Sequence, residues 1–172
     1  MKKEHLNWLQ TNKACDPSIQ WIEEKNIQSL EEAWNTCERG DWLLWMATKL
    51  NVDKRKLVLC AALCAHTVVQ RMQDARSRDA VRVAFLWGRS KATDEQLSSA
   101  RKAAWAAAGG SGAAAAAARA ADADDADGAA RAAALATAWA AADAADKNRL
   151  RTAEIARKVL TEEVMKKIKE IK

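Results

Sequence analysis

Cys60, Cys64 and His66 lie close enough in the chain to suggest a metal site or a cysteine nucleophile. Cys60 and Cys64 are one helical turn apart, so a single helix would present both thiols on the same face. His66 would point to a different side of that helix, and structural zinc requires four ligands in a tetrahedral array. Because free cysteine is among the most buried residue types, we expect both thiols in a hydrophobic core, with no metal and no cofactor.

A second group that could do chemistry is a cluster of four aspartates, namely Asp122, Asp124, Asp125 and Asp127. A calcium-binding EF-hand loop requires an acidic residue at its fifth position, glycine at the sixth and glutamate at the twelfth. Counted from Asp122, those positions hold Ala126, Asp127 and Ala133, which excludes such a loop. Four like charges repel one another at helical spacing. The cluster is therefore either a solvated acidic face or a surface that binds a basic partner.

Basic residues form two groups that would suit nucleic acid. Lys54, Arg55 and Lys56 fall in the first turn of an expected helix, where cations oppose the helix dipole. Residues 147–172 carry nine basic and four acidic residues, whereas residues 113–146 carry two and six. These cations could neutralise phosphates, but a solvated face explains the same pattern. The eight tryptophans could likewise stack on bases or form a core.

The motif Gly40, Asp41, Trp42 and Trp45 predicts a sharp corner between two short helices. Glycine can adopt the left-handed conformation that ends one helix, and aspartate can cap the start of the next. Trp42 and Trp45 are three residues apart and would share one helix face. We expect them either to wedge the corner onto the following helices or to leave at least one ring exposed as an anchor for a partner.

The elements that must position these groups are predicted to be helices. Helix-start signals are Asp16 before Pro17 and two capping boxes, Ser29 with Glu32 and Thr93 with Gln96. Apolar residues at steps of three and four predict another helix from residue 53 to about residue 72. The chain has one proline, and no segment shows the two-residue alternation of a strand. We therefore expect an all-α fold, a compact array of about seven or eight helices.

A single helical domain is expected over residues 1–172, with short Trp- and Leu-rich helices in 1–92 and long alanine-rich helices in 93–172. The tract from Gly109 to Asp146 begins with the linker-like letters GGSG and continues mainly in alanine, the best helix former. It is predicted to be a closely packed helix, with a solvated helix or a disordered tail as alternatives. Only packing at close approach would require its small side chains.

Compartment and partners follow from composition. The N-terminal letters MKKEHLNWLQTNK lack the apolar stretch of an export signal. Charged residues interrupt the alanine tract, so no membrane span is expected. We predict a cytoplasmic protein that needs neither a disulfide nor a metal, because its four cysteines would remain reduced there.

The segment LEEAWNTCERGDWLLWMATKL, residues 30–50, precedes the letters LVLCAALCA and a long alanine-rich region. This arrangement resembles the alanine-rich immunity proteins of bacteria and phages. The likeness in letters is specific over residues 33–50, and the likeness in layout extends over nearly the whole chain. The resemblance implies a cytoplasmic, non-enzymatic protein that binds a toxin or effector. It brings no catalytic residues with it.

The sequence supports two functions, and an enzyme is a third alternative with the least support. The first is a helical binding protein that neutralises a toxin or effector by direct contact, through the acidic cluster at 122–127 or the basic residues 54–56. The second is a protein that binds nucleic acid or inhibits a nuclease through residues 54–56 and the basic last helix, including a phage-encoded inhibitor of a host defence. Binding to nucleic acid would weaken steeply with salt. The partner, the binding surface and the oligomeric state are left open by the sequence.

Overall fold

A computed structural model describes residues 1–107 and 145–171, and these two ranges are helical, without a strand. This confirms the predicted all-α fold. The elements within them are one short 3-10 helix, η1 (Val69–Arg71), and eight α-helices: α1 (Lys3–Thr11), α2 (Asp16–Glu24), α3 (Leu30–Thr36), α4 (Gly40–Lys49), α5 (Lys54–His66), α6 (Ala75–Gly88), α7 (Asp94–Ala107) and α10 (Ala145–Ile168).

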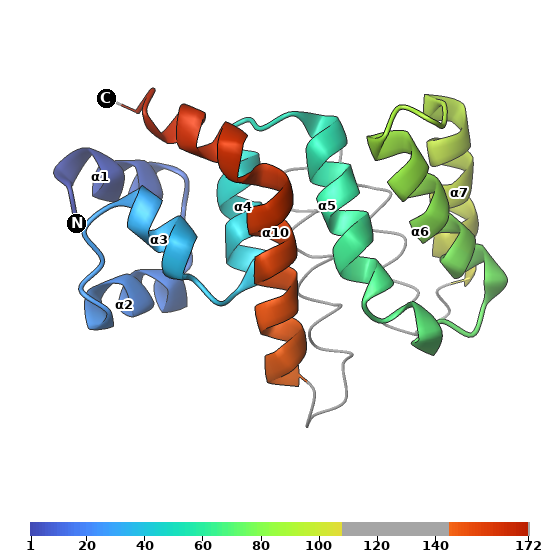
Figure 1. Ribbon diagram of the computed structural model, residues 1–172, viewed down its shortest axis with the longest axis horizontal. Coiled ribbons are helices and arrows are strands. Elements are labelled where there is room, and N and C mark those ends of the chain that lie inside the picture. Colours follow the sequence, from blue (N-terminus) through green and yellow to red (C-terminus); the bar gives the residue numbers. More distant parts are fainter. Residues whose placement is uncertain (108–144, 172) are drawn as a thin grey trace.

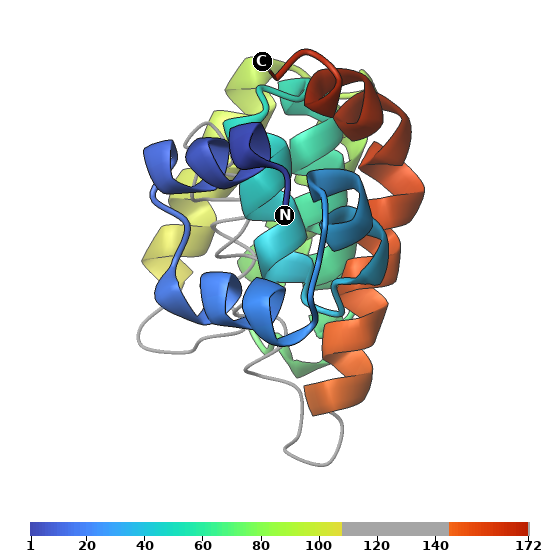
Figure 2. The ribbon, with the colours of Figure 1, turned by 90° about the vertical axis from the view of Figure 1, so that its left-hand side faces the viewer.

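The helices are arranged in sequence order from one end of the molecule to the other, except for the last one (Figure 1). Helices α1 to α3 form one end, α4 and α5 the middle, and α6 and α7 the far end. The C-terminal helix α10 returns to the middle, where it packs on α4 and α5 and also contacts α3. In the view turned by 90° it runs along one side of the molecule (Figure 2). The last helix thus joins the N-terminal end to the centre.

Helix α10 packs through a stripe of apolar residues at helical spacing. Ala153, Ala156, Leu160, Val164 and Ile168 are all buried on it. Alanines at the start of this stripe let neighbouring backbones approach closely, while the larger side chains fill the core further along. The stripe follows the three- and four-residue periodicity of the sequence, but Leu150, three residues before Ala153 in the same pattern, is exposed.

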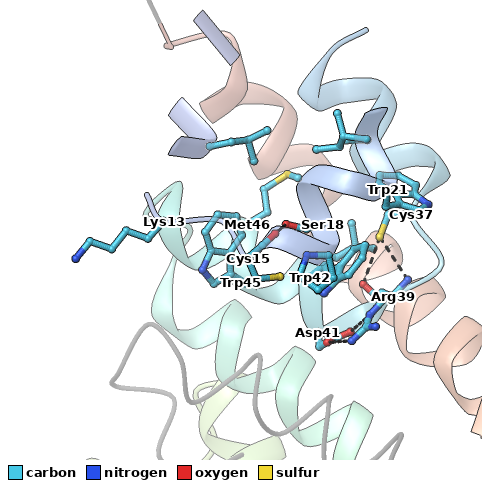
Figure 3. A pocket seen from close by; sticks show the side chains of 15 residues that line it. Lys13, Cys15, Ser18, Trp21, Cys37, Arg39, Asp41, Trp42, Trp45 and Met46 are labelled. Atoms are coloured by element: carbon cyan, nitrogen blue, oxygen red, sulfur yellow. Dashed lines mark hydrogen bonds and ion pairs between the residues drawn. The ribbon is translucent and has the colours of Figure 1, made fainter. Parts of the chain in front are cut away.

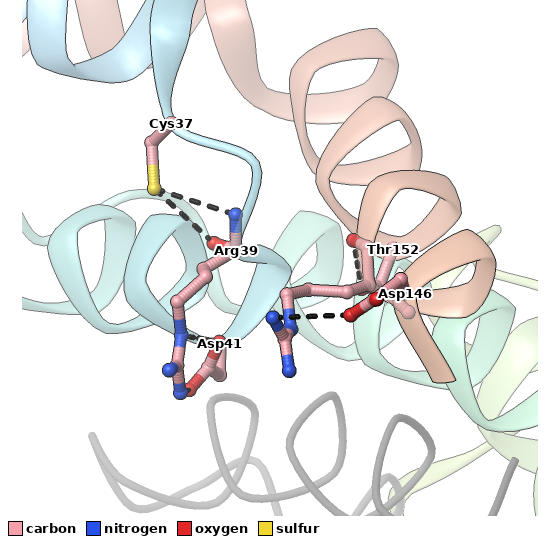
Figure 4. Close-up of polar contacts among 6 residues, drawn as sticks. Cys37, Arg39, Asp41, Asp146 and Thr152 are labelled. Carbon is pink, nitrogen blue, oxygen red and sulfur yellow. Dashed lines mark hydrogen bonds and ion pairs between the residues drawn. The ribbon is translucent and has the colours of Figure 1, made fainter. Parts of the chain in front are cut away.

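The contact between α4 and α10 explains Gly40 and corrects its predicted role. Gly40 is the first residue of α4 and does not end the preceding helix. A Cβ atom at Gly40 would lie only 2.6 Å from both the Cβ and the main-chain carbonyl carbon of Thr152. Glycine is therefore needed for close approach to α10 and not for a left-handed turn. Figure 4 shows Thr152 on α10, adjacent to the start of α4.

The predicted cap at Asp41 is also wrong. The N-cap of α4 is Arg39, and no side chain accepts a hydrogen bond there. The Asp41 carboxylate instead accepts two hydrogen bonds from Arg39, at 3.2 Å from Nε and 2.7 Å from Nη2. A nearby guanidinium competes with the helix N–H groups for the carboxylate, and the charged, two-pronged contact is the stronger one.

Two predicted helix caps that depend on neighbouring residues are confirmed, whereas the predicted bounds of two helices are shifted. Ser29 Oγ accepts the Glu32 N–H at 3.1 Å. Thr93 and Gln96 exchange hydrogen bonds of 2.9 and 3.2 Å. Helix α2 begins at Asp16 itself, with Cys15 as its N-cap, one residue earlier than predicted. The helix expected from 53 to about 72 is shorter, since α5 ends at residue 66 and η1 follows.

Cys60 and Cys64 lie fully buried in the core, as the sequence predicts. His66 is exposed at the end of α5. Within residues 1–107 and 145–171, no cluster of three or more His, Cys, Asp or Glu side chains could hold a metal. In the same ranges, no helix combines the length and hydropathy of a membrane span. The acidic cluster and most of the alanine tract lie outside the described residues.

Candidate functional site

A pocket of about 390 Å³ opens on the face where α1 and α2 pack against α4. Its volume is at the lower end of the range for small-molecule sites, about 300 to 1,000 Å³. Most of its walls are apolar side chains, among them Leu9, Trp21, Ile22, Trp42, Trp45 and Met46. Figure 3 shows the tryptophans arranged around it. A pocket of this kind suits one large apolar group.

Two edge-to-face tryptophan pairs join α4 to α1 and α2, and three of the four rings, those of Trp21, Trp42 and Trp45, line the pocket. The ring centroids of Trp45 and Trp8 are 5.9 Å apart, and those of Trp42 and Trp21 are 6.0 Å apart. This geometry is favourable because the edge of one ring carries positive charge and the face of the other negative charge. All four rings are half-buried. Trp42 and Trp45 thus have their ring partners on the preceding helices, whereas the sequence suggested the following ones.

Arg39 and Asp41 provide a fixed polar edge beside Trp42. The Arg39 guanidinium carbon lies 4.4 Å from the centre of the Trp42 ring, and the same group is held by Asp41. Donating hydrogen bonds to the Asp41 carboxylate raises the pKa of Arg39 above its ordinary value. Stacking on an aromatic face and a two-pronged carboxylate contact are what arginine does better than lysine. The arginine thus keeps its charge and forms part of the wall.

The pocket contains two cysteines with different exposure. Cys15 is exposed at the mouth, whereas Cys37 is buried. The Cys37 sulfur accepts the Arg39 N–H at 3.4 Å. Burial raises the pKa of the Cys37 thiol to about 11, so it is protonated at neutral pH and is a weak nucleophile. Arg157 of α10 donates to the Cys37 carbonyl oxygen at 2.6 Å and ties this wall to the centre of the molecule.

Lys13 stands at the opposite side of the pocket mouth, just after α1. Its backbone is left-handed, with φ of 59°, and its N–H donates to the Gln10 carbonyl at 3.0 Å. A residue in the left-handed conformation commonly ends a helix, and it is usually glycine or asparagine. The side chain is exposed and extends from the mouth away from the tryptophans (Figure 3).

The basic residues at the start of α5 do not line this pocket. Arg55 donates to the Trp87 carbonyl at 2.7 Å, and its guanidinium lies 4.4 Å from the Trp87 ring centre. Lys56 forms an ion pair of 3.0 Å with Glu163 on α10. The Lys54 ammonium is 5.8 Å from the Trp87 ring centre. All three residues therefore contact their own chain.

The sequence did not predict most of the residues that line the pocket. The sequence singled out Trp42 and Trp45, but it missed Trp21 on α2, which lines the pocket, and Trp8 on α1, which packs against Trp45 outside the lining. The concentration of tryptophans near the N-terminus was one available signal, because five of the eight fall within the first 45 residues. Aromatic rings concentrated in short helices cannot all be covered, so some of them must face a surface.

Comparison of the chain with protein-family models, with curated proteins and with solved structures found no match. The resemblance to the alanine-rich immunity proteins therefore stays a prediction.

Proposed function

We propose that this protein is a non-enzymatic binding protein whose tryptophan-lined pocket holds a large apolar side chain of a protein partner. The observation that carries the proposal is the apolar pocket of about 390 Å³ with Trp42 and Trp45 on its wall. Interfaces between proteins draw most of their binding energy from a few large side chains that fill such pockets. The contacts between paired tryptophan rings would hold the pocket open in the absence of a partner.

The polar groups of the pocket support binding over catalysis. Arg39 and Asp41 neutralise each other, and Cys37 is buried and protonated. A general acid or base needs a pKa near the working pH and a free approach to substrate. These groups instead serve to hold the wall in place.

The partner in this proposal is a toxin or effector, the class implied by the resemblance to immunity proteins. We place the encounter in the cytoplasm, where the exposed thiol of Cys15 would stay reduced. The pocket would then block or sequester the partner by direct contact, and no cofactor would take part. The acidic cluster at 122–127 would add a second, charged contact with a basic partner.

Nucleic-acid binding through residues 54–56 has weaker support. Phosphate binding uses lysine and arginine side chains that can reach outward. Arg55 and Lys56 contact Trp87 and Glu163 within the chain, so binding phosphates would require breaking those contacts. A steep loss of nucleic-acid affinity between low and moderate salt would favour this second function.

The exposed thiol allows a direct test of the pocket. Cys15 lines the mouth, and the other three cysteines are buried, so a pyrene maleimide should react with Cys15 first and obstruct the pocket. We expect the labelled protein to lose affinity for its partner by at least about tenfold, the loss typical of an interface anchor. The partner would be recovered from the native host by crosslinking, and its affinity measured by surface plasmon resonance.

A matched control is Cys15→Ser exposed to the same reagent, which should bind its partner like the untreated protein. If the labelled wild type binds the recovered partner with unchanged affinity, the pocket is not the binding site and the proposed function fails.

A further inference from the structure

We infer that the partner segment carries an acidic side chain beside the large apolar side chain that enters the pocket, and that Lys13 selects it. This inference rests on the proposed function and specifies the chemistry of the partner. The pocket itself is apolar, so the selection comes from its mouth.

The charges of the pocket lining leave one cation without a counterion. The lining contains two cations, Lys13 and Arg39, and one anion, Asp41. Asp41 is occupied by Arg39 through two hydrogen bonds. Lys13 is exposed and forms no ion pair within the described residues. The exposed Asp16 is near in sequence but is not part of the lining. Among the described residues that line the pocket, Lys13 is therefore the one uncompensated positive charge.

The direction of the Lys13 side chain places the acidic group outside the pocket. Figure 3 shows this side chain leading away from Trp42 and Trp45. A carboxylate inside the apolar pocket would lose its hydration without gaining a partner, which is costly. A carboxylate on the residue next to the anchor would remain hydrated and still reach the ammonium group. The favoured segment thus has an apolar residue inside and an acidic neighbour at the Lys13 side.

Lys13 can be replaced without disturbing the backbone. Its φ of 59° is the left-handed conformation at the end of α1, which asparagine adopts more readily than lysine. Lys13→Asn therefore removes the charge and should preserve the fold. Lys13→Arg keeps the charge. Lys25→Asn removes one exposed positive charge from the end of α2, outside the pocket lining, and is the matched control for net charge.

The test uses three eight-residue peptides of glycine and serine that differ only in a central pair: Phe-Glu, Phe-Gln or Ala-Glu. Binding to the full chain is followed at low ionic strength through the indole N–H signals of Trp42 and Trp45 in NMR spectra. We expect the Phe-Glu peptide to bind about two- to fivefold more tightly than the Phe-Gln peptide, the effect of one exposed ion pair. The Ala-Glu peptide should bind weakest, because it lacks the anchor.

The variants decide whether Lys13 causes the preference. Lys13→Asn should bind the Phe-Glu and Phe-Gln peptides equally, whereas Lys13→Arg and Lys25→Asn should retain the preference. Equal binding of both peptides by the wild type would overturn the inference and leave the proposed function standing, as would a preference that survives in Lys13→Asn. If the phenylalanine peptides bind no better than Ala-Glu, the anchor pocket itself fails, and the proposed function fails with it.

Discussion

Trp34 and Trp42 are eight residues apart in sequence and lie in two different kinds of surroundings. Trp34 is fully buried between α3 and α10, and its indole N–H donates to Thr161 Oγ1 at 2.8 Å. Trp42 is half-buried on the pocket wall, against the ring of Trp21. The difference depends on what covers each ring: α10 covers one, and the short helices α1 and α2 cover the other only in part. The tightly packed centre supports the open pocket at its edge.

Replacing each of these two tryptophans by alanine should produce the largest difference in the free energy of unfolding. Trp34→Ala is expected to lower the free energy of unfolding by about 3 to 5 kcal/mol, because it leaves a cavity and removes the hydrogen bond that Thr161 Oγ1 accepts. Trp42→Ala should cost no more than about 2 kcal/mol, since its ring is already partly solvated and loses one aromatic pair and the stacked Arg39 guanidinium. Urea unfolding monitored by circular dichroism measures both values. Equal losses would mean that the pocket wall is as tightly packed as the centre.

Gly40 tests the close contact between α4 and α10. Alanine in place of a helical glycine ordinarily stabilises a protein by about 0.5 to 1 kcal/mol. Here the added Cβ would meet Thr152 at 2.6 Å, so Gly40→Ala should instead destabilise by about 1 to 3 kcal/mol, the cost of overpacking.

Combining Gly40→Ala with Thr152→Ala should restore little of this loss, because the main-chain carbonyl carbon of Thr152 is equally close. The exposed substitution Asn35→Ala on α3 is the control, with an expected change within about 0.5 kcal/mol. A stabilised Gly40→Ala variant would show that the two helices can move apart at little cost.

Lowering the pH should destabilise the helices around the pocket before the centre of the molecule, because a buried histidine holds α1 in place. The Leu30 N–H donates to His5 Nδ1 at 3.1 Å. Burial lowers the pKa of His5 below the ordinary value for histidine, despite the opposing attraction of Glu31. The unfolded chain therefore binds this proton more readily than the folded chain does. Stability should be fully present above about pH 6.5 and should fall as the pH drops toward the lowered pKa.

Thermal melts at pH 7.5 and 5.5 would measure this loss. His5→Asn is the comparison variant, because its side-chain oxygen can replace Nδ1 as the acceptor without titrating in this range. Its melting temperature should change less between the two pH values than that of the wild type. Identical pH dependence in both proteins would assign the effect to other groups.

The smallest expected effect concerns Lys56 and its ion pair with Glu163 across α5 and α10. Donating a hydrogen bond to the Glu163 carboxylate raises the pKa of Lys56, and the two charged atoms are 3.0 Å apart and partly exposed. Lys56→Gln should cost about 0.2 to 1 kcal/mol, and less at high salt because exposed charges are screened. Lys158→Gln on the exposed side of α10 should have no measurable effect. A salt-independent loss for Lys56 would point to packing of its carbon chain instead.

The sequence alone determined the helical class and many of the helix ends. The Ser29 and Thr93 caps and the buried stripe of α10 depend on residues within a few positions of one another. Such short-range patterns are readable because hydrogen bonds to helix ends and the 3.6-residue period are local properties. The burial of Cys60 and Cys64 followed from the same periodicity.

The role of Gly40, the surroundings of Arg55 and the existence of the pocket depend on packing between distant segments. Gly40 meets Thr152 more than 100 positions away, and Arg55 meets Trp87. The pocket depends on how α1 and α2 are placed against Trp42 and Trp45. A glycine, an arginine or a tryptophan has the same local preferences in either setting. The role of such a residue depends on which helix packs against it. That neighbour is determined by packing between segments far apart in the chain.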